Sequence, residues 1–180
     1  MPRLVLISGT PASGKTTLAH ELGRILPCPV VSRDEIKEGL VHARDSGTPS
    51  WGDPIADEAF ALFYRVVTEY LRSDCSVVAE AAFFYDLTGG AEALVRLSDA
   101  CIVHCRVDVH VAQRRYTDRA ESDPIRRISH PDDELVNAME AGTFGWERYA
   151  PMEIGVPVLV VDTSDGYRPG LPDIVEFARR

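Results

Sequence analysis

The sequence predicts an α/β fold, in which a parallel sheet of five strands is covered on both faces by helices. Short apolar runs alternate with stretches of helical periodicity along the 180 residues, which is the pattern of repeated strand–helix–strand units. The first apolar run leads into a glycine-containing turn that opens a helix. No internal repeat or shift in composition divides the sequence, so one domain over residues 1–180 is expected.

The first half of the chain contains the clearest elements. Residues 3–8 (RLVLIS) are a short apolar run of the kind that forms a buried parallel strand. A helix follows from Gly14, with leucines at helical spacing, and two prolines close behind end it. Residues 30–32 are the second expected strand and residues 34–41 a short helix, followed by a turn-rich loop at 43–53.

In the second half, Asp53 is placed to cap a helix whose first position is Pro54. The apolar stripe of this helix is predicted to be Ile55, Ala59, Leu62, Val66 and Tyr70. Further strands are expected at 76–80, 101–107 and 156–162, and further helices at 90–97, 108–120 and 172–180. Because active sites of parallel sheets lie beyond the carboxyl ends of the strands, the segments that follow the strands are expected to share one site.

The composition argues against a nucleic-acid partner and against a membrane span. The formal net charge is −9 and the pI about 5.0, whereas a non-specific nucleic-acid surface needs many basic residues. No apolar run reaches the roughly 18–20 residues that a membrane helix requires. The four cysteines have no CxxC spacing, so we expect neither a disulfide framework nor a zinc site, and we expect a cytoplasmic location. The sequence does not indicate an oligomeric state.

Residues 9–16 (GTPASGKT) match the pattern GxxxxGK[ST] of a phosphate-binding loop. The loop lies between a strand and a helix, so its backbone N–H groups and the helix N-terminus converge on phosphate oxygens. Lys15 is predicted to bridge the β- and γ-phosphates, Thr16 to bind Mg²⁺ through its hydroxyl, and Thr17 to reach the α-phosphate. The other residues expected to bind the nucleotide are Gly9, Thr10, Pro11, Ala12, Ser13 and Gly14. The chain is therefore predicted to bind a nucleoside triphosphate.

Asp34 follows the second expected strand, at the same edge of the sheet as the phosphate loop. A carboxylate there can accept the proton of an attacking hydroxyl as it closes on the γ-phosphorus, and it can contact the water shell of the metal. This position favours phosphoryl transfer over hydrolysis. The alternative is that Asp34 only caps the following helix. Lys37 either holds an anionic part of the acceptor or belongs to a solvated helix face.

The phosphate loop together with residues 32–37 (SRDEIK) resembles the P-loop kinases of the polynucleotide-kinase, zeta-toxin and chloramphenicol-phosphotransferase group. The resemblance implies a P-loop NTPase fold of the nucleotide-kinase kind, a three-layer α/β/α sandwich with a helical lid at about 112–131. It also implies that Asp34 is the general base and that Lys37 contacts the acceptor. The specific motifs lie mainly in residues 4–37 and 112–131, and they bear on mechanism more than on substrate.

Glu80 ends the third expected strand, where related kinases carry an acidic residue. The resemblance implies that it hydrogen-bonds the acceptor or a water on Mg²⁺; the alternative is a structural pairing with a lid arginine. This strand carries no Walker B aspartate, so the metal is expected to rest on Thr16, Asp34, phosphate oxygens and waters. Three aromatic residues follow at 83–85, and they either line an acceptor pocket, with Phe83 as a substrate-binding residue, or fill the core under the next helix.

Basic residues concentrate in the segment 112–131 of this otherwise acidic chain. Arg115 and Arg119 are four residues apart and therefore share one face of the expected helix. The resemblance implies that they clamp the β- and γ-phosphates, neutralise charge during transfer and keep water away. Arg126 and Arg127 either join them or are solvated.

Thr163 follows the last expected strand, where folds of this kind bind the purine. No NKxD guanine signature occurs, so ATP is the predicted donor, although several kinases of this kind accept GTP. The sequence therefore predicts an ATP- and Mg²⁺-dependent phosphotransferase that acts on a hydroxyl of a small molecule, such as an antibiotic, a sugar or a nucleoside. The alternatives are a 5′-hydroxyl polynucleotide kinase, a zeta-toxin-like nucleotide-sugar kinase and, from another class, a nucleotide-operated switch or hydrolase.

Overall fold

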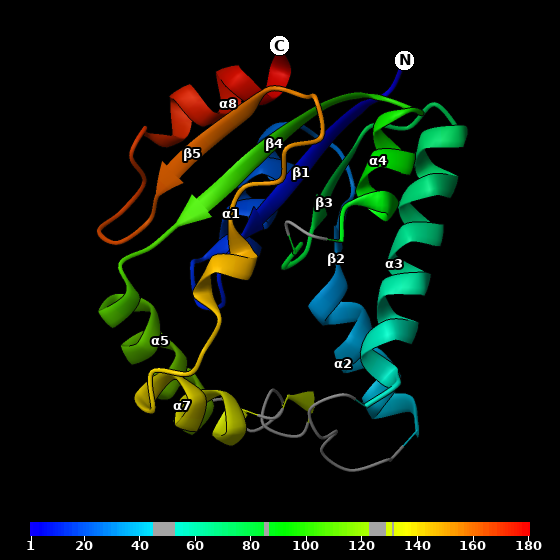
Figure 1. Ribbon diagram of the computed structural model, residues 1–180. Helices are drawn as coiled ribbons and strands as arrows, with labels where there is room; N and C mark the ends of the chain where they lie inside the picture. Colours follow the sequence, from blue (N-terminus) through cyan, green and yellow to red (C-terminus); the bar gives the residue numbers. More distant parts are fainter. Residues whose placement is uncertain (45–52, 85–86, 123–128, 131) are drawn as a thin grey trace.

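The computed structural model describes residues 1–44, 53–84, 87–122, 129–130 and 132–180 (Figure 1). Its strands are β1 (Arg3–Gly9), β2 (Val30–Ser32), β3 (Val77–Glu80), β4 (Asp99–Arg106) and β5 (Val158–Asp162). Its helices are α1 (Lys15–Ile25), α2 (Arg33–Arg44), α3 (Ile55–Arg72), α4 (Gly89–Val95), α5 (Val109–Ser122), α7 (Asp132–Glu140), the short 3₁₀ helix η1 (Trp146–Tyr149) and α8 (Leu171–Arg179).

The five strands form one sheet in the order β2-β3-β1-β4-β5, and every neighbouring pair is parallel. The predicted α/β fold with a five-stranded parallel sheet is therefore confirmed. The apolar strand β1 lies in the centre, where both of its edges are paired. Its register places Ile7 beside Glu80 of β3, and Ser32 of β2 also lies beside Glu80. The chain segments that leave these strands therefore start from neighbouring points.

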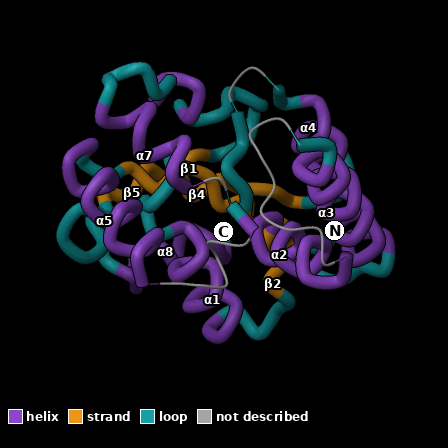
Figure 2. Tube along the Cα trace, turned by 90° about the horizontal axis from the view of Figure 1, so that it is seen from below, coloured by secondary structure: helices purple, strands orange, loops and turns teal. Residues whose placement is uncertain are grey.

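Helices cover both faces of the sheet. On one face, α1 and α8 contribute residues such as Leu18 and Ile174 to a core cluster with the strand residues Val5 and Val103. On the other face, α3 and α4 pack on the sheet through a second buried cluster. Figures 1 and 2 show these helices on the two sides of the strands. The layers agree with the three-layer arrangement expected from the sequence.

The apolar stripe of α3 differs in part from the predicted one. The buried residues are Ile55, Ala59, Phe63, Val67 and Leu71, a strict four-residue spacing. The expected positions 62, 66 and 70 are only partly buried, because they flank this row on the helix surface. The predicted cap is present, since a carboxylate oxygen of Asp53 accepts a hydrogen bond from the Ile55 N–H at 2.9 Å.

Beyond the carboxyl ends of the strands lie α2, α5 and α7 (Figure 1). Helices α5 and α7 pack together, and Tyr116 and Met139 form a small buried cluster with Ala12 of the phosphate loop. Helix α7 and η1 were not predicted from the sequence. None of the described helices is long and apolar enough to cross a membrane.

Candidate active site

The phosphate loop has the backbone conformation that its glycines permit. Gly9 has φ 137° and lies so close to β4 that a Cβ atom would meet the Cys105 carbonyl oxygen at 2.1 Å. Gly14 has φ 77° and stands immediately before α1. The side chain of Lys15 is buried, and its Nζ donates to the Thr10 carbonyl oxygen at 2.9 Å. The phosphate loop thus leads directly into α1, and the Lys15 side chain folds back over the loop.

Glu80 lies beneath the loop and is almost fully buried, at 1% exposed. Its Oε2 accepts hydrogen bonds from the Ser32 hydroxyl at 2.7 Å and from the Thr16 hydroxyl at 3.3 Å. Burial raises the pKa of Glu80 above its ordinary value, and the neighbouring Asp34 raises it further, while Lys15 and the two hydroxyls oppose the shift. Among the described residues, the partners of Glu80 are therefore two hydroxyls, whereas the sequence left open a pairing with an arginine of segment 112–131.

Hydroxyl and carboxylate oxygens, such as those of Thr16 and Glu80, are ligands that suit Mg²⁺. The Thr16 hydroxyl and the Glu80 carboxylate meet at the end of β3, the strand that carries no Walker B aspartate. Asp34, the second expected metal residue, is the next charged carboxylate along this edge and interacts electrostatically with Glu80. The residues present therefore fit an Mg²⁺ ion held beside the phosphate loop.

Asp34 stands in the first turn of α2, at the mouth of the site, with its side chain 33% exposed. Its Oδ1 pairs with Arg33 Nη1 at 3.0 Å, and Arg33 is fixed in turn by the Ala56 carbonyl oxygen and the Phe60 ring. Burial opposes ionisation of Asp34, but His130, Arg33 and Lys15 outweigh it and hold its pKa well below the usual range. Asp34 is therefore a carboxylate at neutral pH.

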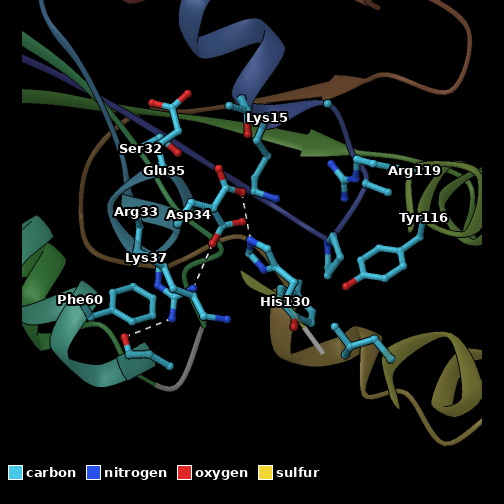
Figure 3. Close-up of a pocket in the computed structure, with 18 of the residues that line it drawn as sticks. Lys15, Ser32, Arg33, Asp34, Glu35, Lys37, Phe60, Tyr116, Arg119 and His130 are labelled. Carbon is cyan, nitrogen blue, oxygen red and sulfur yellow. Dashed lines mark hydrogen bonds and ion pairs between the residues drawn. The ribbon is translucent and has the colours of Figure 1, made fainter. Parts of the chain in front are cut away.

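A cavity of about 540 Å³ opens between the phosphate loop, α2, α3 and α5. Figure 3 shows Arg33 and Phe60 on one side of it and Tyr116 and Arg119 on the other, with His130 between them in this view. Of the predicted site residues, the cavity is lined by Pro11, Ala12, Gly14, Lys15, Thr16, Thr17, Asp34, Lys37 and Arg119. The phosphate loop, the proposed base and one lid arginine therefore face the same space.

A second cavity of about 360 Å³ lies on the other side of the phosphate loop. It contains Arg115 and Thr163, and it shares Arg119 with the first cavity. The Arg115 Nη2 donates to the carbonyl oxygens of Thr163 and Ser164 at 2.9 and 3.1 Å. Arg115 and Arg119 both line this second cavity, while Arg115 lies one helical turn nearer to β4 and contacts the loop after β5. That the two arginines clamp the same phosphates stays a prediction.

Thr163 connects that loop to the phosphate loop. Its hydroxyl donates to the Ser13 carbonyl oxygen at 2.8 Å and lies 3.1 Å from the Arg106 carbonyl oxygen. The side chain is buried. Thr163 therefore supports the loop from below, in addition to lining the second cavity.

The structure does not bring Phe83 to the cavity. Phe83 is 3% exposed and packs edge-on against Phe63 of α3, with ring centroids 5.9 Å apart. The next residue, Phe84, points the other way and lines the cavity. The expectation that Phe83 binds the substrate is thus corrected in favour of its neighbour, because successive side chains of an extended segment face opposite sides. Tyr85, Arg126 and Arg127 lie outside the described residues.

Sequence reasoning missed several residues of the cavity. His130 is buried, and its Nε2 lies 3.1 Å from Glu38 Oε1. Tyr116 lies between the two lid arginines in the sequence, so helical spacing gave a signal for it. Arg148 and Tyr149 come from η1, which carries no motif that could have identified them.

A family model described as an AAA domain matches residues 4–143, which is more than half of the chain. The chain belongs to this AAA domain family. The matched range contains the phosphate loop, α2, Arg115 and Arg119, so most of the candidate site lies within it. The 3₁₀ helix with Arg148 and Tyr149 lies beyond the matched range.

Solved structures share the fold over nearly the whole chain. A candidate kinase from Chloroflexus aurantiacus J-10-fl is 27% identical, with a TM-score of 0.85 over 99% of this chain and 97% of that one. A sugar kinase from Janibacter sp. HTCC2649 is 15% identical, with a TM-score of 0.60 over 99% and 92%. Shikimate kinase from Bacteroides thetaiotaomicron is 20% identical, with a TM-score of 0.57 over 98% and 96%. No match was found among curated protein sequences. The fold is therefore a P-loop fold of the kinase-like kind.

Proposed function

We propose that this chain is a phosphotransferase that moves the γ-phosphoryl group of ATP onto a hydroxyl of a small molecule. The observation that carries the proposal is the position of Asp34. Its ionised carboxylate and the buried Lys15 line the same cavity of about 540 Å³, which the phosphate loop closes at one end. A hydrolase or switch has no need of a carboxylate facing a cavity large enough for a second substrate.

In the proposed reaction the acceptor oxygen forms a bond to the γ-phosphorus while the bond from that phosphorus to the β–γ bridging oxygen breaks. ADP leaves with the electron pair of that bond, and the hydroxyl proton passes to Asp34. A carboxylate with a lowered pKa is a weak base, so its main contribution is to orient the hydroxyl and to accept the proton late. Lys15 and Arg119 are the cations that stabilise the transferring group.

The remaining site residues bind the nucleotide and the metal in this proposal. The second cavity, with Arg115 and Thr163, is the candidate site of the nucleoside part of ATP. Thr16 and Glu80 are the candidates for holding Mg²⁺, directly or through water. A bound Mg²⁺ supplies positive charge that offsets the charge of the phosphate oxygens during transfer. Lys37 is buried and lines the cavity, which supports a role in binding the acceptor.

The finer resemblance to the polynucleotide-kinase, zeta-toxin and chloramphenicol-phosphotransferase group stays part of the proposal. It is supported by the phosphate loop and by Asp34 at the start of α2. The similar structures include a sugar kinase and a shikimate kinase, which also favours a small hydroxyl compound as acceptor. The acidic net charge of −9 argues against an oligonucleotide.

A transfer assay tests the proposal. The protein is incubated with ATP, Mg²⁺ and a panel of hydroxylated antibiotics, sugars, nucleosides, hydroxy acids, a nucleotide sugar and a 5′-hydroxyl oligonucleotide, and mass spectrometry detects added phosphate. We expect phosphate on a small-molecule class, and loss of that product in Lys15→Met. Hydrolysis of ATP at the same rate with and without the panel, with no phosphorylated compound, would sink the proposal and favour a hydrolase.

A further inference from the structure

Part of the cavity wall is formed by an arginine stacked on aromatic rings. The guanidinium of Arg148 lies over the Phe84 ring, 4.4 Å from its centroid. Phe84 packs against Tyr149 with ring centroids 5.2 Å apart, and Tyr149 stacks on Phe144 at 5.7 Å with the rings 7° from parallel. Stacking fixes the plane of a guanidinium and leaves the N–H groups on its edge available for a ligand.

The charged residues that line the cavity differ in their partners. Three carboxylates of α2 line the cavity, and each has a basic partner: Asp34 pairs with Arg33, Glu35 with His20 and Glu38 with His130. By contrast, no carboxylate of the described residues lies within ion-pair distance of Arg148. Its guanidinium stacks on the Phe84 ring instead. A cation that lines a substrate cavity and has no carboxylate partner in the described part of the chain is suited to an anion from the substrate.

Tyr149 adds a neutral donor next to this arginine. It is 7% exposed and lines the same cavity, and its hydroxyl makes no hydrogen bond to the described residues. Burial raises the pKa of Tyr149 to about 12, so the hydroxyl keeps its proton and can donate it. Both Arg148 and Asp34 act electrostatically on Tyr149, and all three residues line the same cavity. The hydroxyl is open to the cavity, where a bound ligand can accept a hydrogen bond from it.

We propose that the phosphoryl acceptor carries an oxyanion, a carboxylate or a phosphoryl group, which Arg148 and Tyr149 bind while Asp34 orients the reacting hydroxyl. This inference rests on the proposed phosphotransferase function. The guanidinium donates two hydrogen bonds from its edge, and the tyrosine hydroxyl donates a third. Arg148 and Tyr149 are specificity residues in this arrangement, because they bind the acceptor at a distance from the transferred phosphoryl group.

Binding is measured first, without any transfer. The full chain is saturated with Mg²⁺ and the non-hydrolysable analogue AMP-PNP and titrated in a calorimeter with paired probes. Each hydroxy acid is paired with its amide, for example gluconate with gluconamide, and each sugar phosphate with its free sugar, for example ribose 5-phosphate with ribose. We expect binding in one charged class only, which distinguishes a carboxylate from a phosphoryl group. Equal binding of the neutral partners, or no binding of any charged probe, would overturn the inference.

The variants Arg148→Gln and Tyr149→Phe connect the binding to these residues. We expect Arg148→Gln to weaken binding of the charged probe by about 10- to 100-fold, and to raise KM similarly in the transfer assay while kcat changes by less than about threefold. Tyr149→Phe should weaken binding by about three- to tenfold. The matched control is Arg114→Gln, because Arg114 is exposed on α5 and the substitution removes the same charge outside the cavity. An unchanged affinity in Arg148→Gln contradicts the inference.

The two proposals fail separately. If the charged probe binds in an Arg148-dependent way but never receives phosphate from ATP, the oxyanion site stands and the phosphotransferase proposal fails. If neutral hydroxyl compounds receive phosphate as efficiently as their charged partners, the phosphotransferase proposal stands and the oxyanion site is refuted.

Discussion

Replacing Asp34 with asparagine removes one negative charge and keeps the size of the side chain. In the proposed reaction the acceptor hydroxyl loses its proton acceptor and the partner that orients it. General-base catalysis contributes about 10²- to 10⁴-fold, so kcat for transfer should fall by that factor, equivalent to about 3–5 kcal/mol in the activation free energy. Affinity for ATP should not decrease, because Asp34 is an anion that interacts with Lys15 beside the triphosphate site.

The structure also limits what else this substitution changes. Arg33 loses its 3.0 Å ion pair with the carboxylate, but the Ala56 carbonyl oxygen and the Phe60 ring still hold it. The Asp34 side chain is 33% exposed, so the free energy of unfolding should change by no more than about 1 kcal/mol. A loss of activity in a folded variant that still binds ATP then reports on the chemical step.

The assay compares two variants of neighbouring carboxylates. Transfer to the acceptor identified in the panel is followed by ADP formation and by mass spectrometry, and ATP binding by calorimetry. Glu35→Gln is the control, since Glu35 is half-exposed at the cavity and already pairs with His20 at 2.6 Å, and it should keep kcat within about twofold. If Asp34→Asn keeps more than about a tenth of wild-type kcat, or if both variants lose activity equally, the assignment of Asp34 is refuted.

Three further predictions concern core, pH-dependent and phosphate-loop residues. Phe83→Ala should lower the free energy of unfolding by about 3–5 kcal/mol, because Phe83 lies in the core, whereas Phe84→Ala should mainly raise KM for the acceptor. Chemical denaturation and enzyme kinetics distinguish the two variants, and equal stabilities would contradict the assignment. Burial, with Lys15 and Arg106, lowers the pKa of His104 from 6.5 to about 4, so the unfolded chain binds the proton first and stability falls by up to about 3 kcal/mol as pH decreases from 6.5 to 4. His104→Gln should flatten this pH dependence, and an unchanged slope would show that other groups cause it. Gly9→Ala should impair both folding and ATP binding, because its Cβ would meet a backbone oxygen of β4 at 2.1 Å; a variant that melts and binds ATP like the wild type would refute this.

Sequence reasoning succeeded where a local pattern determines the structure. The phosphate loop was predicted with its strand and helix because glycine spacing, an apolar run and a helical repeat agree over residues 3–26. Asp34 was found because it follows a strand directly, and parallel strands bring their carboxyl ends together. These predictions need no knowledge of distant contacts.

The errors concern features that depend on tertiary packing. Two consecutive phenylalanines have the same local signal, and only the position of α3 decides that Phe83 enters the core and Phe84 the cavity. The contact of Arg115 with the carbonyl oxygens of the loop after β5 was not predicted, because that loop is distant from Arg115 in the sequence. Arg148 belongs to a 3₁₀ helix that lies far along the chain from every motif, so no spacing rule connects it with Asp34.

A single-turnover experiment shows directly whether the γ-phosphoryl group of ATP is transferred to the acceptor. Enzyme in excess over ATP that is radiolabelled in the γ-phosphate is mixed with saturating acceptor and Mg²⁺, and the labelled products are separated. We predict that the label moves to the acceptor hydroxyl in equal amount to the ADP formed. Label that appears only as inorganic phosphate, in the presence of every acceptor that binds the cavity, would contradict the account.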